Sequence, residues 1–150
     1  MNLFTKLQER EAEGRPITVG LIGAGKFGTM YIHQALRTPG VHLVGIADLS
    51  PTRAIENLKR VGCPQERYRA SSIDDALKNR TTFLIDDWRA LVEHPKIDVI
   101  AECTGNPISG RRTLPRRVQE RQADHQRDGR GRCFLWSDSR AQGERGWRPL

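Results

Sequence analysis

Apolar and polar positions alternate regularly along residues 1–110 of the chain. Four short runs rich in β-branched and apolar residues are typical of buried parallel strands, and they cover residues 17–22, 41–47, 82–85 and 97–103. Apolar side chains recur at helical spacing elsewhere, which predicts helices over residues 3–13, 27–37, 51–61, 72–79 and 88–93. The stretch 63–70 follows neither pattern and is expected to be a loop.

The order of these elements predicts the fold class. Strands and helices alternate along the chain, and this order produces parallel strands joined by right-handed helical crossovers. We therefore expect an α/β fold, a Rossmann-type doubly wound parallel sheet of about four strands preceded by a helix. The sheet is expected to be incomplete, because the alternation stops after Gly110.

Residues 111–150 differ in composition from residues 1–110. They hold 11 arginines, 5 acidic residues and no lysine, so this segment carries a formal charge of +6 against +1 for the rest. Only 10 of these 40 residues are apolar, and the segment has no isoleucine and a single valine, so it lacks the residues that favour strands. We expect a partial domain over 1–110 and an irregular, disordered tail without a strand over 111–150.

A shift of reading frame is one hypothesis for this break. Codons can be chosen for residues 111–150 so that removing one base near Gly110 yields a helix, a β-branched strand and a further helix, as the fold requires. The tail would then be an out-of-frame translation, and the chain would be a truncated part of a longer protein. Sequencing the locus tests this, because an intact reading of the given frame, without the extra base, contradicts it.

The alternative for the tail is a basic arm that binds nucleic acid. The whole chain has 150 residues and a formal net charge of +7, and arginines beside Phe134, Trp136 and Trp147 suit contacts with phosphates and bases. The absence of lysine from this segment disfavours that alternative.

Several other classes are excluded by composition. No apolar run is long enough to predict a membrane-spanning helix, and the charged start of the chain has no apolar signal-peptide core. The three cysteines form no CxxC pair and are odd in number, which predicts a protein of the reducing cytoplasm rather than a disulfide framework. The four histidines lack the spacing of metal ligands, so we expect no metal site.

A glycine-rich turn, Gly23-Ala24-Gly25-Lys26-Phe27-Gly28, joins the first predicted strand to the next helix. In this G-x-G-x-x-G pattern the first glycine permits a tight turn, the second leaves room for a pyrophosphate, and the third lets the helix pack on the strand. Free N–H groups at the start of the helix attract phosphates. The pattern predicts a dinucleotide site, and the alternative is a glycine-rich turn without a ligand.

Two charged residues after the second strand bear on the choice of cofactor. Asp48 ends this strand 20 residues after Gly28, where a carboxylate accepts hydrogen bonds from the ribose hydroxyls of NAD and repels a 2′-phosphate. Arg53 lies five residues further on and could pair with the 2′-phosphate of NADP. The alternatives are that Asp48 only caps the next helix and that Arg53 is a solvated helix residue.

The fourth strand ends in the turn Glu102-Cys103-Thr104-Gly105-Asn106-Pro107. Ligands of open α/β sheets lie beyond the carboxyl ends of the strands, so we expect Cys103, Thr104 and Gly105 beside the nicotinamide. The alternative is a plain turn formed by glycine and proline. We expect Cys103 to be a small buried residue rather than a nucleophile, and we assign no catalytic residue.

Three segments carry a resemblance to a known family: GRPITVGLIGAGKFG, VHLVGIADLSPTRA and IDVIAECTGNP. With them, residues 1–110 resemble the N-terminal NAD(P)-binding domain of homoserine-dehydrogenase-like oxidoreductases, closest to the SAF-domain branch with its deoxyxylulose-phosphate-reductoisomerase-like enzymes. The resemblance implies oxidoreduction of a small polyol, sugar phosphate or semialdehyde. It implies that Gly23, Gly25, Gly28 and Asp48 hold the adenosine and pyrophosphate, and that Thr104 and Gly105 line the nicotinamide side.

The same resemblance implies that the catalytic residues follow the nucleotide-binding domain. We therefore expect this chain to bind NAD or NADP without turnover of its own, and to associate with itself through an exposed edge of the sheet. A non-enzymatic dinucleotide-binding module is the alternative function.

Overall fold

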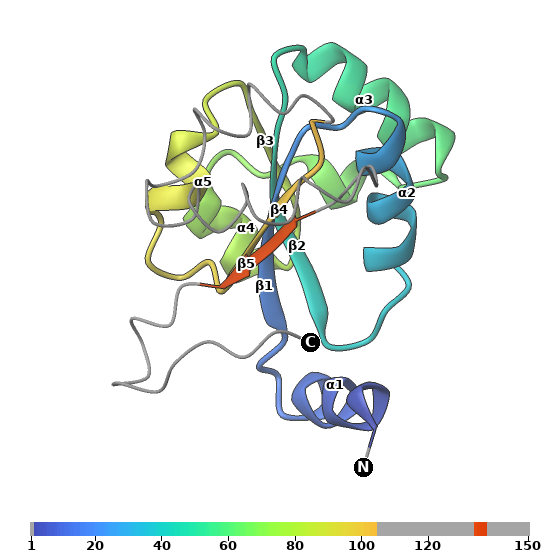
Figure 1. Ribbon diagram of the computed structural model, residues 1–150, viewed down its shortest axis with the longest axis vertical. Helices are drawn as coiled ribbons and strands as arrows, with labels where there is room; N and C mark the ends of the chain where they lie inside the picture. Colours follow the sequence, from blue (N-terminus) through green and yellow to red (C-terminus); the bar gives the residue numbers. More distant parts are fainter. Residues whose placement is uncertain (1, 105–133, 138–150) are drawn as a thin grey trace, which may run out of the picture.

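The computed structural model describes residues 2–104 and the backbone of a strand at 134–137. A five-stranded sheet forms the centre of the molecule, in the strand order β3-β2-β1-β4-β5 (Figure 1). Strands β1 to β4 run parallel, and β5 runs antiparallel to β4. The strands are β1 (Ile17–Ile22), β2 (Val41–Ala47), β3 (Phe83–Ile85), β4 (Val99–Glu102) and β5 (Phe134–Ser137).

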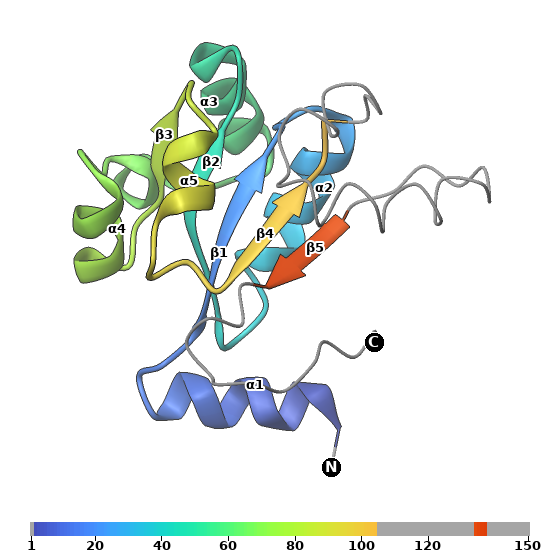
Figure 2. The same cartoon turned by 60° about the vertical axis from the view of Figure 1, so that its left-hand side comes forward.

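Helices cover both faces of the sheet, and α1 lies beyond the ends at which the strands begin (Figure 2). Helices α2 and α3 cover one face, and α4 and α5 cover the other. The helices are α1 (Leu3–Ala12), α2 (Lys26–Ala35), α3 (Pro51–Arg60), α4 (Ile73–Asn79) and α5 (Arg89–Glu93). The α/β class and the parallel sheet expected from the sequence are thus confirmed.

The region expected to be a loop contains a short 3-10 helix, η1 (Gln65–Tyr68). Tyr68 is buried there and joins the apolar cluster between the sheet and α2 and α3, which also contains Leu21, Ile32 and Leu58. A second cluster around Val44, Leu91 and Ile100 lies under α4 and α5. A single aromatic anchor has no periodicity, which is why the pattern of the sequence did not predict this turn.

The register of the strands brings three turns to one edge of the sheet. Residues Ile17 to Ile22 of β1 pair with Val41 to Ala47 of β2, and Ile22 also lies opposite Glu102 of β4. The backbone ladder continues one residue further, because the amide of Gly23 donates to Ala47 O and the amide of Cys103 donates to Ile22 O, both at 2.8 Å. The residues that follow β1, β2 and β4 therefore lie side by side.

The prediction that residues 111–150 form no strand is wrong at Phe134–Ser137. This segment pairs with β4 along its whole length, from Glu102 opposite Phe134 to Val99 opposite Ser137. The outer edge of β4 offers backbone groups for pairing, and a Phe-Leu-Trp run has the β propensity to use them. The outer edge of β4 is therefore paired, and the outer strands of the described sheet are β3 and β5.

The rest of the tail lies outside the described residues. The expectations of disorder, of an out-of-frame translation and of a nucleic-acid-binding arm stay predictions. Among the residues that the structure does describe, no helix has the length and apolar character needed to cross a membrane.

Candidate functional site

The turn at 23–28 leaves the end of β1 and passes directly into α2. Gly23 has a φ of +89°, and a Cβ placed on it would lie 2.8 Å from the amide nitrogen of Thr104. A Cβ on Gly28 would lie only 2.0 Å from the carbonyl oxygen of Gly23. Backbone conformation and close packing therefore require glycine at both positions, as the sequence pattern predicted.

Gly25 differs from the other two glycines of the turn. It is the N-cap of α2 with an ordinary φ of −71°, and a Cβ built on it would meet no atom of the described structure within 4 Å. Neither the backbone nor the packing of the described residues excludes a side chain there. The absence of a side chain instead leaves space open in front of the first turn of α2.

The first turn of α2 has no negative group and no side-chain cap of its own. Gly25 has no side chain that could bond to the free amides of this turn, and the turn contains no acidic residue. The positive end of the helix dipole is therefore not neutralised by the helix itself. Lys26 and Phe27 are exposed on this turn, and Phe27 keeps 55% of its surface accessible.

Asp48 connects the end of β2 to the glycine-rich turn. Its Oδ2 accepts a hydrogen bond from the amide of Ala24 at 2.8 Å, and its Oδ1 accepts one from the amide of Ser50 at 2.8 Å. The residue is buried, and bonds from amides to a carboxylate are charge-assisted. Asp48 therefore fixes the turn to the second strand, a role that the sequence pattern did not predict.

Arg53 completes the bonding of Asp48. Its Nη2 lies 2.8 Å from Asp48 Oδ1, and the guanidinium side chain is 56% exposed while that of Asp48 is 2% exposed. Arg53 is therefore exposed but not merely solvated, because the first turn of α3 brings it onto the carboxylate. The amide of Arg53 also donates to the hydroxyl of Ser50, which is the N-cap of α3.

Two further polar side chains hold the turn, and the pattern of the sequence did not single them out. Asn57 is buried on α3, and its Nδ2 donates to the carbonyl of Ala24 at 2.5 Å. The hydroxyl of Thr29 donates to the carbonyl of Gly25 at 2.8 Å. Asn57 interrupts the apolar face between Ala54 and Leu58, and this break is the signal that could have identified it.

The segment after β4 forms the third side of the site. Cys103 is 3% exposed and packs in the core beside α2, as expected of a small buried residue. The buried carboxylate of Glu102 accepts hydrogen bonds from both the amide and the hydroxyl of Thr104. Thr104 is exposed next to Gly23, whereas Gly105 lies outside the described residues.

The structure thus gathers the glycine-rich turn, Asp48, Arg53 and Thr104 at the carboxyl edge of the sheet. In the described residues there is no group of three or more His, Cys, Asp or Glu side chains that could hold a metal ion. The fold and this edge define a Rossmann-like α/β domain. No protein-family model matches the chain, and a search of curated proteins also gives no match.

Proposed function

We propose that this domain binds a nicotinamide dinucleotide at the turn between β1 and α2. The observation that carries the proposal is the contrast within the turn. Gly23 and Gly28 are glycine because the protein itself occupies the space of a side chain, whereas a Cβ at Gly25 would meet no atom of the described residues within 4 Å. A glycine that the protein does not need, at the N-terminus of a helix, suits the close approach of a pyrophosphate.

The remaining residues of the site support the same proposal. The amides of the first turn of α2 would bond to the pyrophosphate oxygens, and Arg53 would face the adenosine ribose from α3. Asp48, Asn57 and Thr29 hold the backbone of the turn in place through bonds to Ala24 and Gly25. Thr104 lies at the end of β4, where the nicotinamide side of the cofactor would pass.

The activity we propose is that of the coenzyme-binding part of an oxidoreductase. The cofactor supplies the hydride when bound, and the protein binds and orients it. The substrate class that we propose is a small polyol, sugar phosphate or semialdehyde, and this part of the proposal rests on the resemblance of the three segments named above. We assign no catalytic residue among the described side chains, and we expect the purified chain to bind the cofactor without turnover.

Titration of the full chain with NADPH and NADH tests the proposal. We expect saturable binding to the wild type and a loss of at least about tenfold in affinity for Gly25→Val, because the valine fills the space that the pyrophosphate needs. The melting temperature of Gly25→Val should stay within about 2 °C of the wild type, since no described atom lies near the new side chain.

The outcomes of this titration separate binding from folding. Unchanged affinity in a folded Gly25→Val protein would contradict the proposal, and so would the absence of saturable binding to the wild type. Gly25→Ala serves as the matched control, because one methyl group should weaken binding less than the branched side chain does. Oxidation of NADPH by the purified chain with a sugar-phosphate or semialdehyde substrate would contradict the expectation of no turnover.

A further inference from the structure

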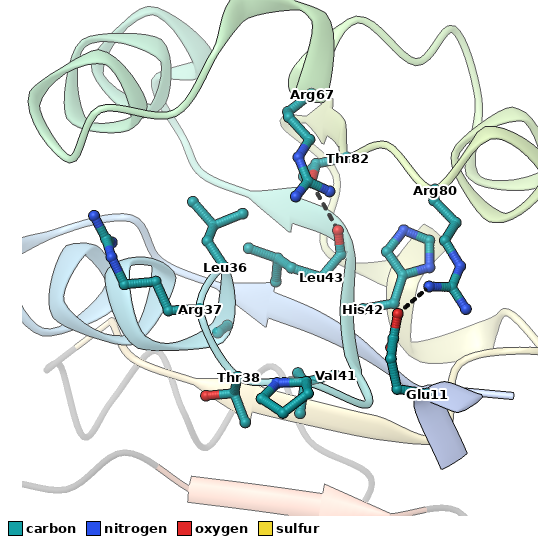
Figure 3. A pocket seen from close by; sticks show the side chains of 12 residues that line it. Glu11, Leu36, Arg37, Thr38, Val41, His42, Leu43, Arg67, Arg80 and Thr82 are labelled. Atoms are coloured by element: carbon teal, nitrogen blue, oxygen red, sulfur yellow. Dashed lines mark hydrogen bonds and ion pairs between the residues drawn. The ribbon is translucent and has the colours of Figure 1, made fainter. Parts of the chain in front are cut away.

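A pocket lies at the opposite end of the sheet from the proposed dinucleotide site (Figure 3). It has a volume of about 250 Å³ and is lined by the amino end of β2, by the carboxyl ends of α1 and α2, and by segments around η1 and β3. Strand β2 runs from this pocket to Asp48, which at about 3.3 Å per residue places the two sites roughly 20 Å apart. The pocket is therefore separate from the site proposed above.

The lining of the pocket combines an apolar floor with a basic rim. Leu36, Val41 and Leu43 contribute the apolar surface. Three arginines, Arg37, Arg67 and Arg80, and a single carboxylate, Glu11, belong to the lining, so the charged groups sum to +2, although Figure 3 shows the guanidinium of Arg37 directed away from the cavity. An excess of guanidinium groups around a small concave surface favours an anionic ligand.

Arg67 is the exposed arginine of this pocket whose side chain has no bonded partner among the described residues. Its guanidinium makes no ion pair or hydrogen bond with another residue in the part of the chain that the structure describes. Figure 3 shows its guanidinium beside Thr82 and above Leu43, directed at the cavity. Arg80 is partly neutralised, because its Nη1 lies 2.5 Å from Oε1 of Glu11.

The hydrogen-bond acceptors near the pocket, a carboxylate and two backbone carbonyls, already have donors. Besides its ion pair with Arg80, Glu11 accepts a hydrogen bond from the amide of Gly40 at 3.0 Å, which together lower the pKa of Glu11. The carbonyls at the end of α2 have partners as well: Arg37 donates to His33 O at 3.1 Å, and the hydroxyl of Thr38 donates to Gln34 O at 2.8 Å. An anion would therefore meet few free acceptors there.

We propose that this pocket binds a small organic anion, a phosphate or sulfate monoester whose short carbon chain lies on the apolar floor. Arg67 and Arg80 would hold the charged oxygens from two sides, with geometry that the planar guanidinium group favours. Leu36, Val41 and Leu43 would cover the carbon chain. The proposal does not rest on the dinucleotide site, because none of its residues belongs to that site.

His42 lies in the pocket and would report on its occupancy. Its Nε2 is 2.8 Å from the carbonyl oxygen of Thr81, so that nitrogen carries a proton and Nδ1 is the free position. Burial of the ring lowers the pKa of His42, and the positive charges of Arg80 and Arg67 lower it further. The bond to Thr81 and the negative charge of Glu11 raise the pKa, but the net shift is downward. A bound anion would offset the two arginines, raise the pKa of His42 and so couple binding to proton uptake.

The test uses calorimetric titration of the full chain with n-butyl phosphate, inorganic phosphate and n-butanol. We expect butyl phosphate to bind at least about fivefold more tightly than inorganic phosphate, because it also buries its carbon chain, and n-butanol not to bind measurably. Arg67→Ala should lower the affinity for butyl phosphate by about tenfold, which is the loss expected for a charge-assisted contact. Arg69→Ala removes the same charge from an exposed position outside the pocket and should change the affinity by less than about twofold.

Two further arms separate this pocket from the dinucleotide site and from unspecific attraction. Gly25→Val should bind butyl phosphate like the wild type, and Arg67→Ala should bind NADPH like the wild type. Butyl sulfate does not titrate near neutral pH, and we expect it to bind more tightly at pH 6 than at pH 8 in the wild type but not in His42→Gln. The proposal would be overturned if Arg67→Ala and Arg69→Ala lost the same affinity for butyl phosphate, or if Gly25→Val lost affinity for it. Equal binding of butyl phosphate and inorganic phosphate by the wild type would also overturn it.

Discussion

Asp48 and Arg53 form an ion pair in which the negative partner is hidden and the positive partner faces solvent. The atoms Asp48 Oδ1 and Arg53 Nη2 are 2.8 Å apart, and the side chains are 2% and 56% exposed. Two backbone amides also donate to the carboxylate. The accessible charge at this edge of the sheet is therefore that of the guanidinium, although the sequence places a carboxylate at the end of the strand.

This pair leads to a prediction about the choice of cofactor. Because Asp48 is bonded within the protein and Arg53 faces outwards, we expect the chain to bind NADPH more tightly than NADH. Arg53→Ala should lower the affinity for NADPH by about tenfold and the affinity for NADH by less than about threefold, because only NADPH offers a 2′-phosphate to the guanidinium. Titration of both cofactors measures this, with Arg60→Ala, an exposed arginine at the end of α3, as the control. Equal losses of both cofactors in Arg53→Ala would contradict it.

The glycines of the turn should respond to substitution in opposite ways. Gly28→Ala places a Cβ 2.0 Å from the carbonyl oxygen of Gly23, so the helix must move away from the strand. We expect the free energy of unfolding to fall by at least about 2 kcal/mol, the scale of overpacking in a core. Gly25→Ala should change it by less than about 1 kcal/mol, because no described atom lies within 4 Å of the new Cβ. Urea denaturation compares the two, and similar losses would show that the contrast between these glycines is wrong.

Asn57 should affect both stability and binding. Asn57→Ala removes the amide that donates to the carbonyl of Ala24. That carbonyl oxygen then keeps only the longer hydrogen bond from the hydroxyl of Thr29, at 3.3 Å, among the described side chains. We expect the free energy of unfolding to fall by about 1–3 kcal/mol, and NADPH binding to weaken because the turn is less firmly held. Asn79→Ala is the matched control, since Asn79 is exposed at the end of α4. A stability loss no larger than that of the control would argue against the role of Asn57.

His42 should make stability depend on pH near neutrality. Burial lowers its pKa below 6.5 in the folded chain, so the unfolded chain takes up a proton first as the pH falls. The contribution of His42 is therefore complete above pH 6.5 and decreases as the pH falls from there towards the folded pKa. Unfolding in urea between about pH 8 and 5.5 measures this slope, which His42→Gln should reduce and the exposed His33→Gln should not. Glu11 does not interfere, because its lowered pKa lies below this range.

The sequence predicted most of the described fold because each element carries its own local signal. The β-branched runs, the serine caps Ser50 and Ser72 and the stops at glycine mark strand and helix boundaries without reference to the rest of the chain. The strand β5 was not predicted, because a four-residue strand within an arginine-rich segment depends on the free edge of β4 and not on its own composition.

The positions of the three motif glycines and of Asp48 were readable from the spacing of the sequence, because the ends of adjacent parallel strands meet at one edge. Only the tertiary structure decided what these residues contact. The burial of Asp48, its bonds to Ala24 and Arg53, and the support from Asn57 join residues from separate elements, whose approach depends on how α2 and α3 pack on the sheet. The basic pocket around Arg67 and His42 has the same origin, because packing brings its lining together from distant segments of the chain.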